Sequence, residues 1–326
     1  MEKESAMFLN THFPGARKYW HMGTFYDWSE ATFHPMSHAL HYGTCTFEGI
    51  RAYDTARGPA VFRLPEHIDR FLHSASVIKM VPPYSKSEII ESVRLVMREN
   101  GLKSAYIRPL LFYSYGNLGL VPKACPVELL IGAWEWGAYL GEKAAEGVSA
   151  FIVPRRRVHH SQLDMRAKLG GTYVQSTIAG LEARAEGHDE AIFLNLEGRV
   201  AEGPGENIFV FKGKTVKTNG IKESVLEGIT RTSLLEIAAD RGYRTEIGPI
   251  TKEELFGADE AFFTGTAVEI TSIVRVADGS DPKAGKMERA IGDGKPGKVF
   301  LELKAAFKDI VVGKVPKYEK WLTYVY

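Results

Sequence analysis

The stretch SKSEIIESVRLVMRENG, residues 85–101, constrains the fold more tightly than any other part of the sequence. Ser85 and Glu88 have the spacing of a capping box, in which each side chain bonds the other residue's backbone at a helix start. Apolar residues then recur at helical spacing, and Gly101 stands where a helix commonly ends. The stretch therefore predicts a helix with one apolar face, and that face needs another layer to cover.

Strand-like runs on either side of this helix supply such a layer. A second helix is predicted over 65–80, with Pro65 in the first turn, where proline is tolerated. Branched and aromatic residues predict strands in AVFRL (60–64), AYIRPLLFYSY (105–115) and VELLIGAW (127–134). These elements predict a small N-terminal α/β domain over residues 1–135, with helices packed on a sheet.

The rest of the chain predicts a second domain, because 326 residues are enough for two domains of ordinary size. A stretch rich in Gly and Ala at 136–147 has no apolar period and predicts an interdomain linker. Beyond it, strand-like runs alternate with helical stretches at 173–186, 229–242 and 296–308, and hairpin turns are predicted at EGR (197–199) and KGK (212–214). The expected fold class is mixed α+β, with a larger C-terminal domain over 148–326 built on a mainly antiparallel sheet or pseudo-barrel.

Charge and composition exclude several classes of protein. There are 41 Lys and Arg against 40 Asp and Glu, and a net charge of +1 provides no field that attracts nucleic acid. No apolar run reaches the roughly 18 residues of a membrane span, and the charged start MEKESAMF lacks the apolar core of a secretory signal. Cys45 and Cys125 are too few for a disulfide scaffold or a cysteine zinc site. We therefore expect a cytoplasmic protein with reduced thiols.

Lys168 has an unusual setting in DMRAKLGGTY (164–173), with an alanine before it and two glycines shortly after it. The alternative is a solvated lysine, since most lysines are exposed. Burial instead lowers the pKa of a lysine, and the neutral amine is a nucleophile that condenses with an aldehyde. The aldehyde that this chemistry implies is pyridoxal 5'-phosphate, which also needs an anion for its pyridine nitrogen and a cup for its phosphate.

Three further segments match those needs. Glu202 precedes a glycine turn in AEGPGEN (201–207), where a carboxylate can hold a pyridinium proton, although a solvated turn glutamate is the alternative. Gly228, Ile229 and Thr230 stand at a predicted helix start, whose N–H groups and dipole favour a phosphate. The same residues are equally consistent with Thr230 as an ordinary N-cap. TGTA (264–267) offers a second turn of small residues.

Seven motifs together resemble one known family. They are HALHYGTCTFEGIRAY (38–53), HIDRFLHSA (67–75), AYIRPL (105–110), AKLGGTY (167–173), AEGPGENIF (201–209), LEGITR (226–231) and FFTGTAVEI (262–270). Their order and spacing resemble those of the branched-chain amino acid aminotransferases, which are fold-type IV enzymes dependent on pyridoxal phosphate. The resemblance runs from about residue 18 to about residue 310. It implies transamination between branched-chain L-amino acids and 2-oxoglutarate by a ping-pong route.

The resemblance also implies roles in cofactor binding. Lys168 would join the cofactor covalently and act as base and acid in the proton shift. Glu202 would pair with the pyridine nitrogen, and Tyr173 would bond the ring's phenolic oxygen. The phosphate would be held by Arg70, whose planar fork suits it, together with Ile229, Thr230 and Thr266.

For the substrate, the resemblance implies that Tyr106 and the backbone of Thr266 and Ala267 hold the α-carboxylate. Arg108 would bind the second carboxylate of glutamate. The walls of the side-chain pocket would be Phe47, Gly49, Tyr139 and Tyr42, with Tyr42 contributed across a dimer interface. Without the motif, Phe47 and Tyr139 would be core aromatics by default, and Arg108 would be equally well explained as a structural ion-pair partner.

Some segments depart from the family pattern. Arg155, Arg156 and Arg157 replace part of a proline-rich approach to the lysine, and a solvated loop is favoured over a nucleic-acid patch. His159 and His160 are adjacent rather than spaced to place two ligands on one face, so no metal is expected.

Three alternatives of the same fold type stay open: a D-amino acid aminotransferase, an (R)-amine aminotransferase and an aminodeoxychorismate lyase. YSYGNLGLVP (113–122) differs from the commonest family form of its loop, which bears on that choice. A non-catalytic protein that keeps the cofactor is a fourth alternative, against which the presence of both Lys168 and Glu202 argues. The family pattern implies a homodimer or a larger assembly, such as a trimer of dimers.

Overall fold

The computed structural model describes residues 13–137, 145–281, 283 and 287–326. The chain divides into two compact units. The first unit comprises the described residues of Met1–Gly137, Ala167–Gly171 and Val311–Tyr326, and the second those of Ala138–Arg166 and Thr172–Ile310. Most of the linker predicted at 136–147 lies outside the described residues. No helix in the described ranges combines the length and apolar character needed to cross a membrane.

The first unit is built on an antiparallel sheet of order β16-β5-β4-β6-β7-β1-β2, with β3 paired to β6. Its strands are β1 (Lys18–His21), β2 (Thr24–Asp27), β3 (Cys45–Phe47), β4 (Ile50–Thr55), β5 (Gly58–Phe62), β6 (Ala105–Tyr113), β7 (Val127–Trp134) and β16 (Leu322–Tyr324). Its α-helices are α1 (His38–Tyr42), α2 (Leu64–Val77) and α3 (Lys86–Asn100). Short 3-10 helices occupy Trp28–Glu30 and Pro316–Trp321.

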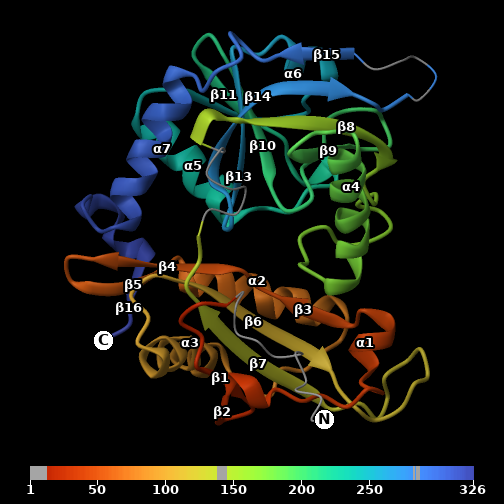
Figure 1. Ribbon diagram of the computed structural model, residues 1–326, viewed down its shortest axis with the longest axis vertical. Coiled ribbons are helices and arrows are strands. Elements are labelled where there is room, and N and C mark those ends of the chain that lie inside the picture. Colours follow the sequence, from red (N-terminus) through yellow and green to blue (C-terminus); the bar gives the residue numbers. More distant parts are fainter. Residues whose placement is uncertain (1–12, 138–144, 282, 284–286) are drawn as a thin grey trace, which may run out of the picture. The chain divides into compact units, whose positions relative to one another are not determined.

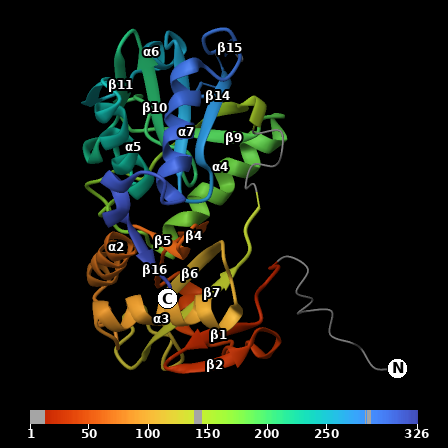
Figure 2. The same ribbon diagram turned by 90° about the vertical axis from the view of Figure 1, so that its left-hand side faces the viewer.

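The helix predicted first in the sequence is confirmed as α3. Ser85 accepts the backbone N–H of Glu88, Glu88 in turn accepts the backbone N–H of Ser85, and Gly101 ends the helix at a φ of 65°. Alternate residues of β6 and β7 join the apolar faces of α2 and α3 in one core; Ile107, Leu111 and Leu129 are among them. Both helices therefore cover the same face of the sheet (Figures 1 and 2).

The second unit has a mixed sheet of order β12-β11-β10-β13-β14-β8-β9, with β15 paired to β14. Its strands are β8 (Val148–Arg156), β9 (Glu190–Leu194), β10 (Asn207–Lys212), β11 (Thr215–Thr218), β12 (Arg244–Ile247), β13 (Glu260–Gly265), β14 (Glu269–Asp278) and β15 (Met287–Ala290). Its α-helices are α4 (Tyr173–Ala185), α5 (Ile229–Asp240), α6 (Lys252–Phe256) and α7 (Lys298–Val311), of which α7 ends at the unit boundary. The remaining helical turns are 3-10 segments at Gly170–Thr172 and Ile221–Glu223.

The centre of this sheet, β11-β10-β13-β14, is antiparallel, whereas β12 pairs with β11, and β8 with β14 and β9, in parallel. The predicted turn at KGK is confirmed, with Gly213 at a φ of 62° between β10 and β11. The turn at EGR is also present, because Asn195 donates its N–H to the Arg199 carbonyl over 2.8 Å.

The two faces of this sheet have separate cores. Ile192 and Ile208 belong to one apolar cluster, whereas Phe193 packs with Ala179 and Ala183 of α4 in another. The helices α5 and α7 lie beside each other in both views (Figures 1 and 2). The expected fold class, mixed α+β with antiparallel sheets, is confirmed.

Candidate active site

The backbone of Lys168 is held by two elements of the first unit. Its N–H donates to the Ser74 hydroxyl of α2 over 2.8 Å, and its carbonyl accepts the Thr46 hydroxyl over 3.0 Å and the Phe47 N–H over 3.3 Å. The side chain is half-buried, with Nζ 4.8 Å from the centroid of the Phe47 ring. The amine therefore stands against an aromatic wall on a backbone that other residues fix in place.

Gly170, two residues after Lys168, permits the close packing of the lysine loop against Cys45. A Cβ on Gly170 would lie 2.3 Å from the Sγ atom of Cys45, a distance that side chains do not tolerate. Burial raises the pKa of the Cys45 thiol, although a backbone hydrogen bond from Gly170 opposes the shift. Cys45 therefore acts as a packing residue under the lysine loop rather than as a thiolate.

Arg70 is anchored by a buried carboxylate that the sequence analysis did not single out. Its Nε and one terminal nitrogen donate to the two oxygens of Glu48 over 2.7 and 2.8 Å, and Nδ1 of His67 bonds the same carboxylate over 2.8 Å. Burial acts to raise the pKa of Glu48, but the charge and hydrogen bonds of Arg70, with those of His67, hold it well below its ordinary range. Burial lowers the pKa of His67. Glu48 therefore fixes the orientation of the predicted phosphate-binding arginine.

Strand alternation in β6 separates its core residues from its predicted site residues. Ile107 and Leu111 face the core, so Tyr106 and Arg108 project from the opposite face. The Arg108 guanidinium carbon lies 4.7 Å from the Phe47 ring centroid and 5.3 Å from that of Tyr106, and one terminal nitrogen bonds the Tyr106 hydroxyl over 3.1 Å.

Arg108 has no acidic partner in the described ranges, and its buried Nε has no hydrogen-bond acceptor there. The alternative of a structural ion pair therefore finds no support among those residues. Arg108 is half-buried and its Nε is shielded from water, which is costly without an acceptor, and an anion supplied by a ligand would reduce that cost.

Gly49 and Trp136 complete the surroundings of Tyr106. A Cβ on Gly49 would lie 2.0 Å from the Tyr106 hydroxyl oxygen, so the tyrosine can reach this position only beside a glycine. The Trp136 ring stacks on Tyr106, with centroids 4.5 Å apart and planes 27° apart. The sequence analysis placed Trp136 in the linker and did not predict this contact. The available signal was an aromatic residue two positions after the end of a predicted strand.

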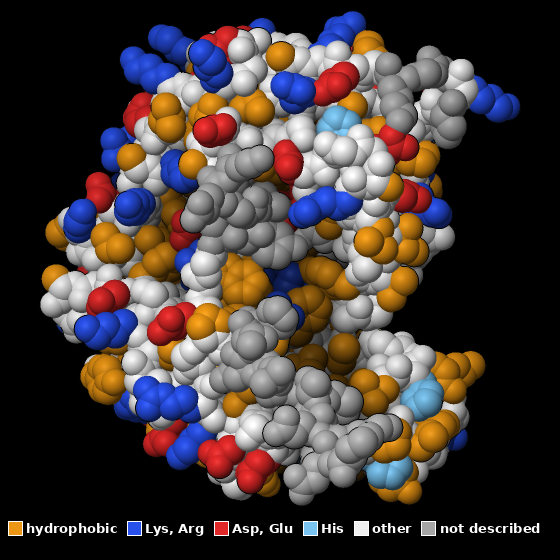
Figure 3. Space-filling model, in the orientation of Figure 1, with side chains coloured by type: hydrophobic (Ala, Val, Ile, Leu, Met, Phe, Trp, Pro, Cys, Tyr) orange, Lys and Arg blue, Asp and Glu red, His pale blue; other side chains and the backbone are white. Residues whose placement is uncertain are grey.

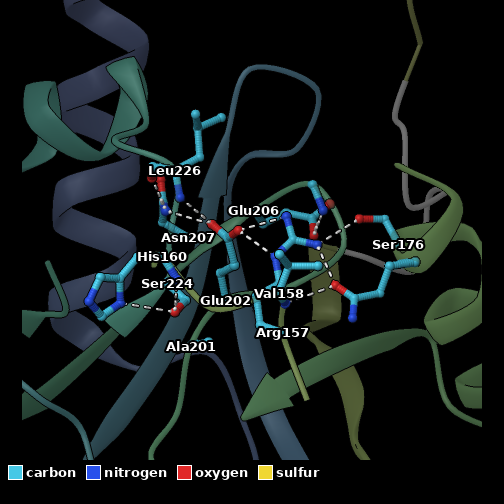
Figure 4. Close-up of polar contacts among 12 residues, drawn as sticks. Arg157, Val158, His160, Ser176, Ala201, Glu202, Glu206, Asn207, Ser224 and Leu226 are labelled. Carbon is cyan, nitrogen blue, oxygen red and sulfur yellow. Dashed lines mark hydrogen bonds and ion pairs between the residues drawn. The ribbon is translucent and has the colours of Figure 1, made fainter. Parts of the chain in front are cut away.

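The second unit holds Glu202, which is 3% exposed. Oε1 of its carboxylate accepts Nε and a terminal nitrogen of Arg157 over 3.0 and 2.9 Å. Oε2 accepts the Leu226 N–H over 2.9 Å and the side-chain amide of Asn207 over 3.3 Å. Figure 4 shows the carboxylate between Arg157 on one side and Asn207 and Leu226 on the other. The alternative of a solvated turn glutamate is therefore wrong.

The solvated-loop interpretation of the three arginines is wrong for Arg157, which is 5% exposed. Arg155 is exposed and pairs with Glu182 on the surface over 2.7 Å, as that interpretation expects. Three consecutive arginines give no sequence signal that tells which one turns inward. The rings of His159 and His160 lie 4.0 Å apart, and the described residues contain no group of three His, Cys, Asp or Glu side chains that could hold a metal ion.

The start of α5, where a phosphate cup was predicted, has no side-chain cap. The N-cap is Gly228, with a φ of −67° and a ψ of 137°, and no side chain caps the helix. The alternative with Thr230 as N-cap is wrong, because Thr230 is the second residue of the helix and is buried. A Cβ on Gly228 would lie 2.1 Å from Oδ1 of Asn207, so only glycine allows this approach. Ile229 and Thr230 thus present first-turn amides of the kind that bind phosphate.

The remaining predicted residues fall in both units. Tyr173 is the first residue of α4 and is half-buried. Thr266 and Ala267 form the turn between β13 and β14. Tyr42 ends α1 and donates its hydroxyl to the Leu118 carbonyl over 2.9 Å. Tyr139 lies outside the described residues. The first unit thus carries the amine and the aromatic and cationic groups, and the second carries the buried carboxylate and the uncapped helix.

A lysine amine and a guanidinium thus lie near the same Phe47 ring, an arrangement typical of an enzyme site for anionic substrates. Residues 46–276 match the model of the family described as amino-transferase class IV. A branched-chain-amino-acid aminotransferase of Pseudomonas aeruginosa is 44% identical over 308 residues, which cover 94% of this chain and 96% of that protein.

Solved structures agree with these matches. The branched-chain amino acid aminotransferase of Escherichia coli has a TM-score of 0.89 and 38% identity, covering 95% of this chain and 100% of that one. The T.th. branched-chain amino acid aminotransferase, complexed with N-(5'-phosphopyridoxyl)-L-glutamate, has a TM-score of 0.88 and 41% identity, covering 95% and 99%. The chain therefore belongs to the class IV aminotransferases, as its seven motifs indicate.

Proposed function

We propose that the protein transfers the amino group of leucine, isoleucine or valine to 2-oxoglutarate, giving branched-chain 2-oxo acids and L-glutamate by a ping-pong route with pyridoxal 5'-phosphate as cofactor. The names of the relatives support the reaction. The observation that carries the proposal is Arg108, a half-buried cation without an acidic partner in the described ranges, set between the Phe47 and Tyr106 rings.

Groups within each unit are chemically suited to different parts of the cofactor. Glu202 is a buried acceptor for a protonated pyridine nitrogen, and the uncapped start of α5 suits a phosphate. We assign the phosphate to Arg70, Ile229, Thr230 and Thr266, and the phenolic oxygen to Tyr173. When bound, the cofactor supplies an aldehyde and an electron-accepting ring.

The chain's own residues then account for the proton transfers and for substrate binding. Lys168 Nζ takes a proton from the substrate's α-carbon and returns one in the second half-reaction, and its fixed backbone limits where the amine can reach. Tyr106, with the backbone of Thr266 and Ala267, holds the α-carboxylate. With these assignments, the Lys168 amine can act on both the amino acid substrate and the 2-oxo acid substrate.

The pair of Phe47 and Arg108 explains how one pocket accepts both leucine and glutamate. An aliphatic side chain packs on aromatic walls, to which Phe47, Gly49, Tyr139 and Tyr42 are assigned. The second carboxylate of glutamate instead binds the Arg108 guanidinium, for which two N–H groups form a planar fork. Leucine leaves that cation with its aromatic neighbours, so each substrate uses a different part of the same wall.

Leucine should convert the purified yellow holoenzyme to its amino form, and 2-oxoglutarate should convert it back. We expect the visible absorption of the bound cofactor to fall on addition of leucine, isoleucine or valine and to recover with 2-oxoglutarate. D-alanine, (R)-1-phenylethylamine and aminodeoxychorismate serve as controls. A response to one of these and none to leucine would reassign the protein to another class IV activity.

We also propose a homodimer in the cytoplasm, or a larger assembly of such dimers. Apolar side chains on α1 and on the loop between β6 and β7 are exposed: Leu40, Tyr42, Tyr115, Leu118, Leu120 and Val121. In Figure 3, apolar and histidine side chains gather at the surface that α1 occupies in Figure 1. A second copy is the occupant that also explains why Tyr42 would reach a neighbour's pocket.

Leu120→Asp should weaken this association. Leu120 is 79% exposed in the single chain, and a charge buried there in a dimer would lack a partner, which costs about 3 kcal/mol or more. Light scattering should give a multiple of 36.3 kDa for the natural chain and a smaller mass for the variant. The matched control is Val81→Asp, since Val81 is also 79% exposed but stands outside this surface. A natural chain with the mass of one copy would contradict the dimer.

A further inference from the structure

Hydrogen bonds fix the backbone at Arg157 and at the residues directly before and after it. It follows directly after β8, and its N–H donates to the Leu194 carbonyl over 2.8 Å. Gln175 of α4 bridges the residues before and after it, since its amide nitrogen bonds the Arg156 carbonyl over 2.7 Å and its amide oxygen accepts the Val158 N–H over 3.2 Å. The side chain thus starts from a backbone with little freedom.

The guanidinium is held at both ends. One edge gives two N–H groups to Oε1 of Glu202, and the other terminal nitrogen donates to the Ser176 hydroxyl over 3.2 Å. The guanidinium carbon also lies 5.1 Å from the Phe193 ring centroid. Because both Arg157 and Glu202 are almost fully buried, this ion pair is poorly screened by water.

Arg157 is a cation in direct contact with the Glu202 carboxylate. A carboxylate in an apolar setting prefers its neutral form unless a cation or hydrogen bonds stabilise the charge. The Leu226 and Asn207 bonds involve Oε2 alone, so Arg157 is the donor to Oε1 among the contacts shown in Figure 4. Without Arg157, Glu202 would retain the Leu226 and Asn207 donors and lose a cation in direct contact with its carboxylate, while the charge of Arg231 would still act on it.

We propose that Arg157 is a positioning residue that keeps Glu202 ionised and oriented, so that the bound cofactor's pyridine nitrogen remains protonated during catalysis. The inference rests on the proposed function. A carboxylate paired with a guanidinium is a weak base, and the proton shared between ring and carboxylate then stays on the ring. The electron demand of the ring, and hence the acidity of the substrate's α-hydrogen, depends on that proton.

The test is the ¹⁵N NMR shift of pyridine-labelled pyridoxal phosphate bound to four forms of the protein: the natural chain, Arg157→Met, Arg157→Gln and Arg157→Lys. We expect a protonated-pyridine shift in the natural chain, movement toward the neutral-pyridine shift in the Met and Gln variants, and recovery in the Lys variant, which restores the charge. kcat for leucine should fall about 10- to 100-fold in the Met and Gln variants, the scale known for residues that orient metal ligands.

The matched control is Arg155→Met. Arg155 is two residues away in the same cluster, but its side chain is 54% exposed and pairs with Glu182. This variant should retain the natural shift and the natural kcat. The Gln variant gives the same readout if the Met variant fails to fold, because it removes the charge and keeps a hydrogen-bond donor.

Several results would overturn the inference. A Met or Gln variant with lower thermal stability but a natural ¹⁵N shift would make Arg157 a structural residue only. A neutral-pyridine shift in the natural chain would have the same effect. The shift needs bound cofactor and no amino acid, so it is independent of the response to leucine. A protonated shift that Arg157→Met abolishes, in a protein that ignores leucine, would support this inference and contradict the proposed substrates. Absence of bound cofactor would overturn both.

Discussion

Lys168→Ala is expected to lower kcat for transamination by about 10²- to 10⁴-fold or more, the range attributed to a positioned acid–base group. The variant should fold, because the hydrogen bonds that fix this residue use its backbone N–H and carbonyl rather than its amine. Alanine keeps those bonds to Ser74, Thr46 and Phe47. Steady-state kinetics with leucine and 2-oxoglutarate, together with thermal unfolding, would measure both effects.

The control for this substitution is Lys103→Ala, which removes an exposed lysine of the same unit and should leave kcat unchanged. Borohydride reduction of the natural holoenzyme should leave the cofactor on the peptide that contains Lys168. Normal turnover of Lys168→Ala, or a cofactor adduct on a different peptide, would contradict the assignment of the amine.

Arg108→Met should separate the two half-reactions. Methionine keeps much of the side chain's length beside Phe47 but removes the charge that binds the second carboxylate of glutamate. A hydrogen bond to a charged group is worth about 1.5–3 kcal/mol, so kcat/KM for glutamate and 2-oxoglutarate should fall roughly 10- to 150-fold. Leucine makes no use of this charge, and its half-reaction should change by no more than about threefold.

Single-turnover rates with each substrate would measure the split. Arg57→Met is the control, because Arg57 is exposed and pairs with Glu319 at the surface of the same unit. An equal loss for leucine and glutamate would mean that Arg108 binds the carboxylate common to both substrates. No loss for either would remove it from the substrate site.

Local sequence patterns predicted the secondary structure correctly where that structure depends on residues within a single segment. The strand over Val127–Trp134 has the predicted bounds, and the capping box that Ser85 and Glu88 form was predicted from their spacing. The helix predicted over 229–242 begins at the predicted residue, and its N-cap is Gly228, which excludes the alternative of Thr230 as N-cap. Hydrophobic periodicity and helix capping depend on residues close together in the chain. Both can therefore be predicted from the sequence.

The pairing of strands that are distant in the chain was harder to predict from the sequence. The parallel pairs of β8 with β14 and β9 join segments far apart in the chain, and each strand alone is an apolar run compatible with either direction. A mainly antiparallel sheet was therefore the prediction that turn signals could support. The same limit applies to Trp136, whose contact with Tyr106 depends on the neighbouring positions of β6 and β7.

The sequence by itself determined the family, the fold class and the candidate amine, because seven motifs in register record which residue types stand at which spacing. Only the tertiary structure decided which charged groups are buried and which partners they have. Arg155 and Arg157 are the same residue type two positions apart, yet one pairs with Glu182 in solvent and the other with Glu202 in the interior. The cost of burying a charge depends on every group around it in space, and that environment is assembled from several strands and helices after the chain has folded.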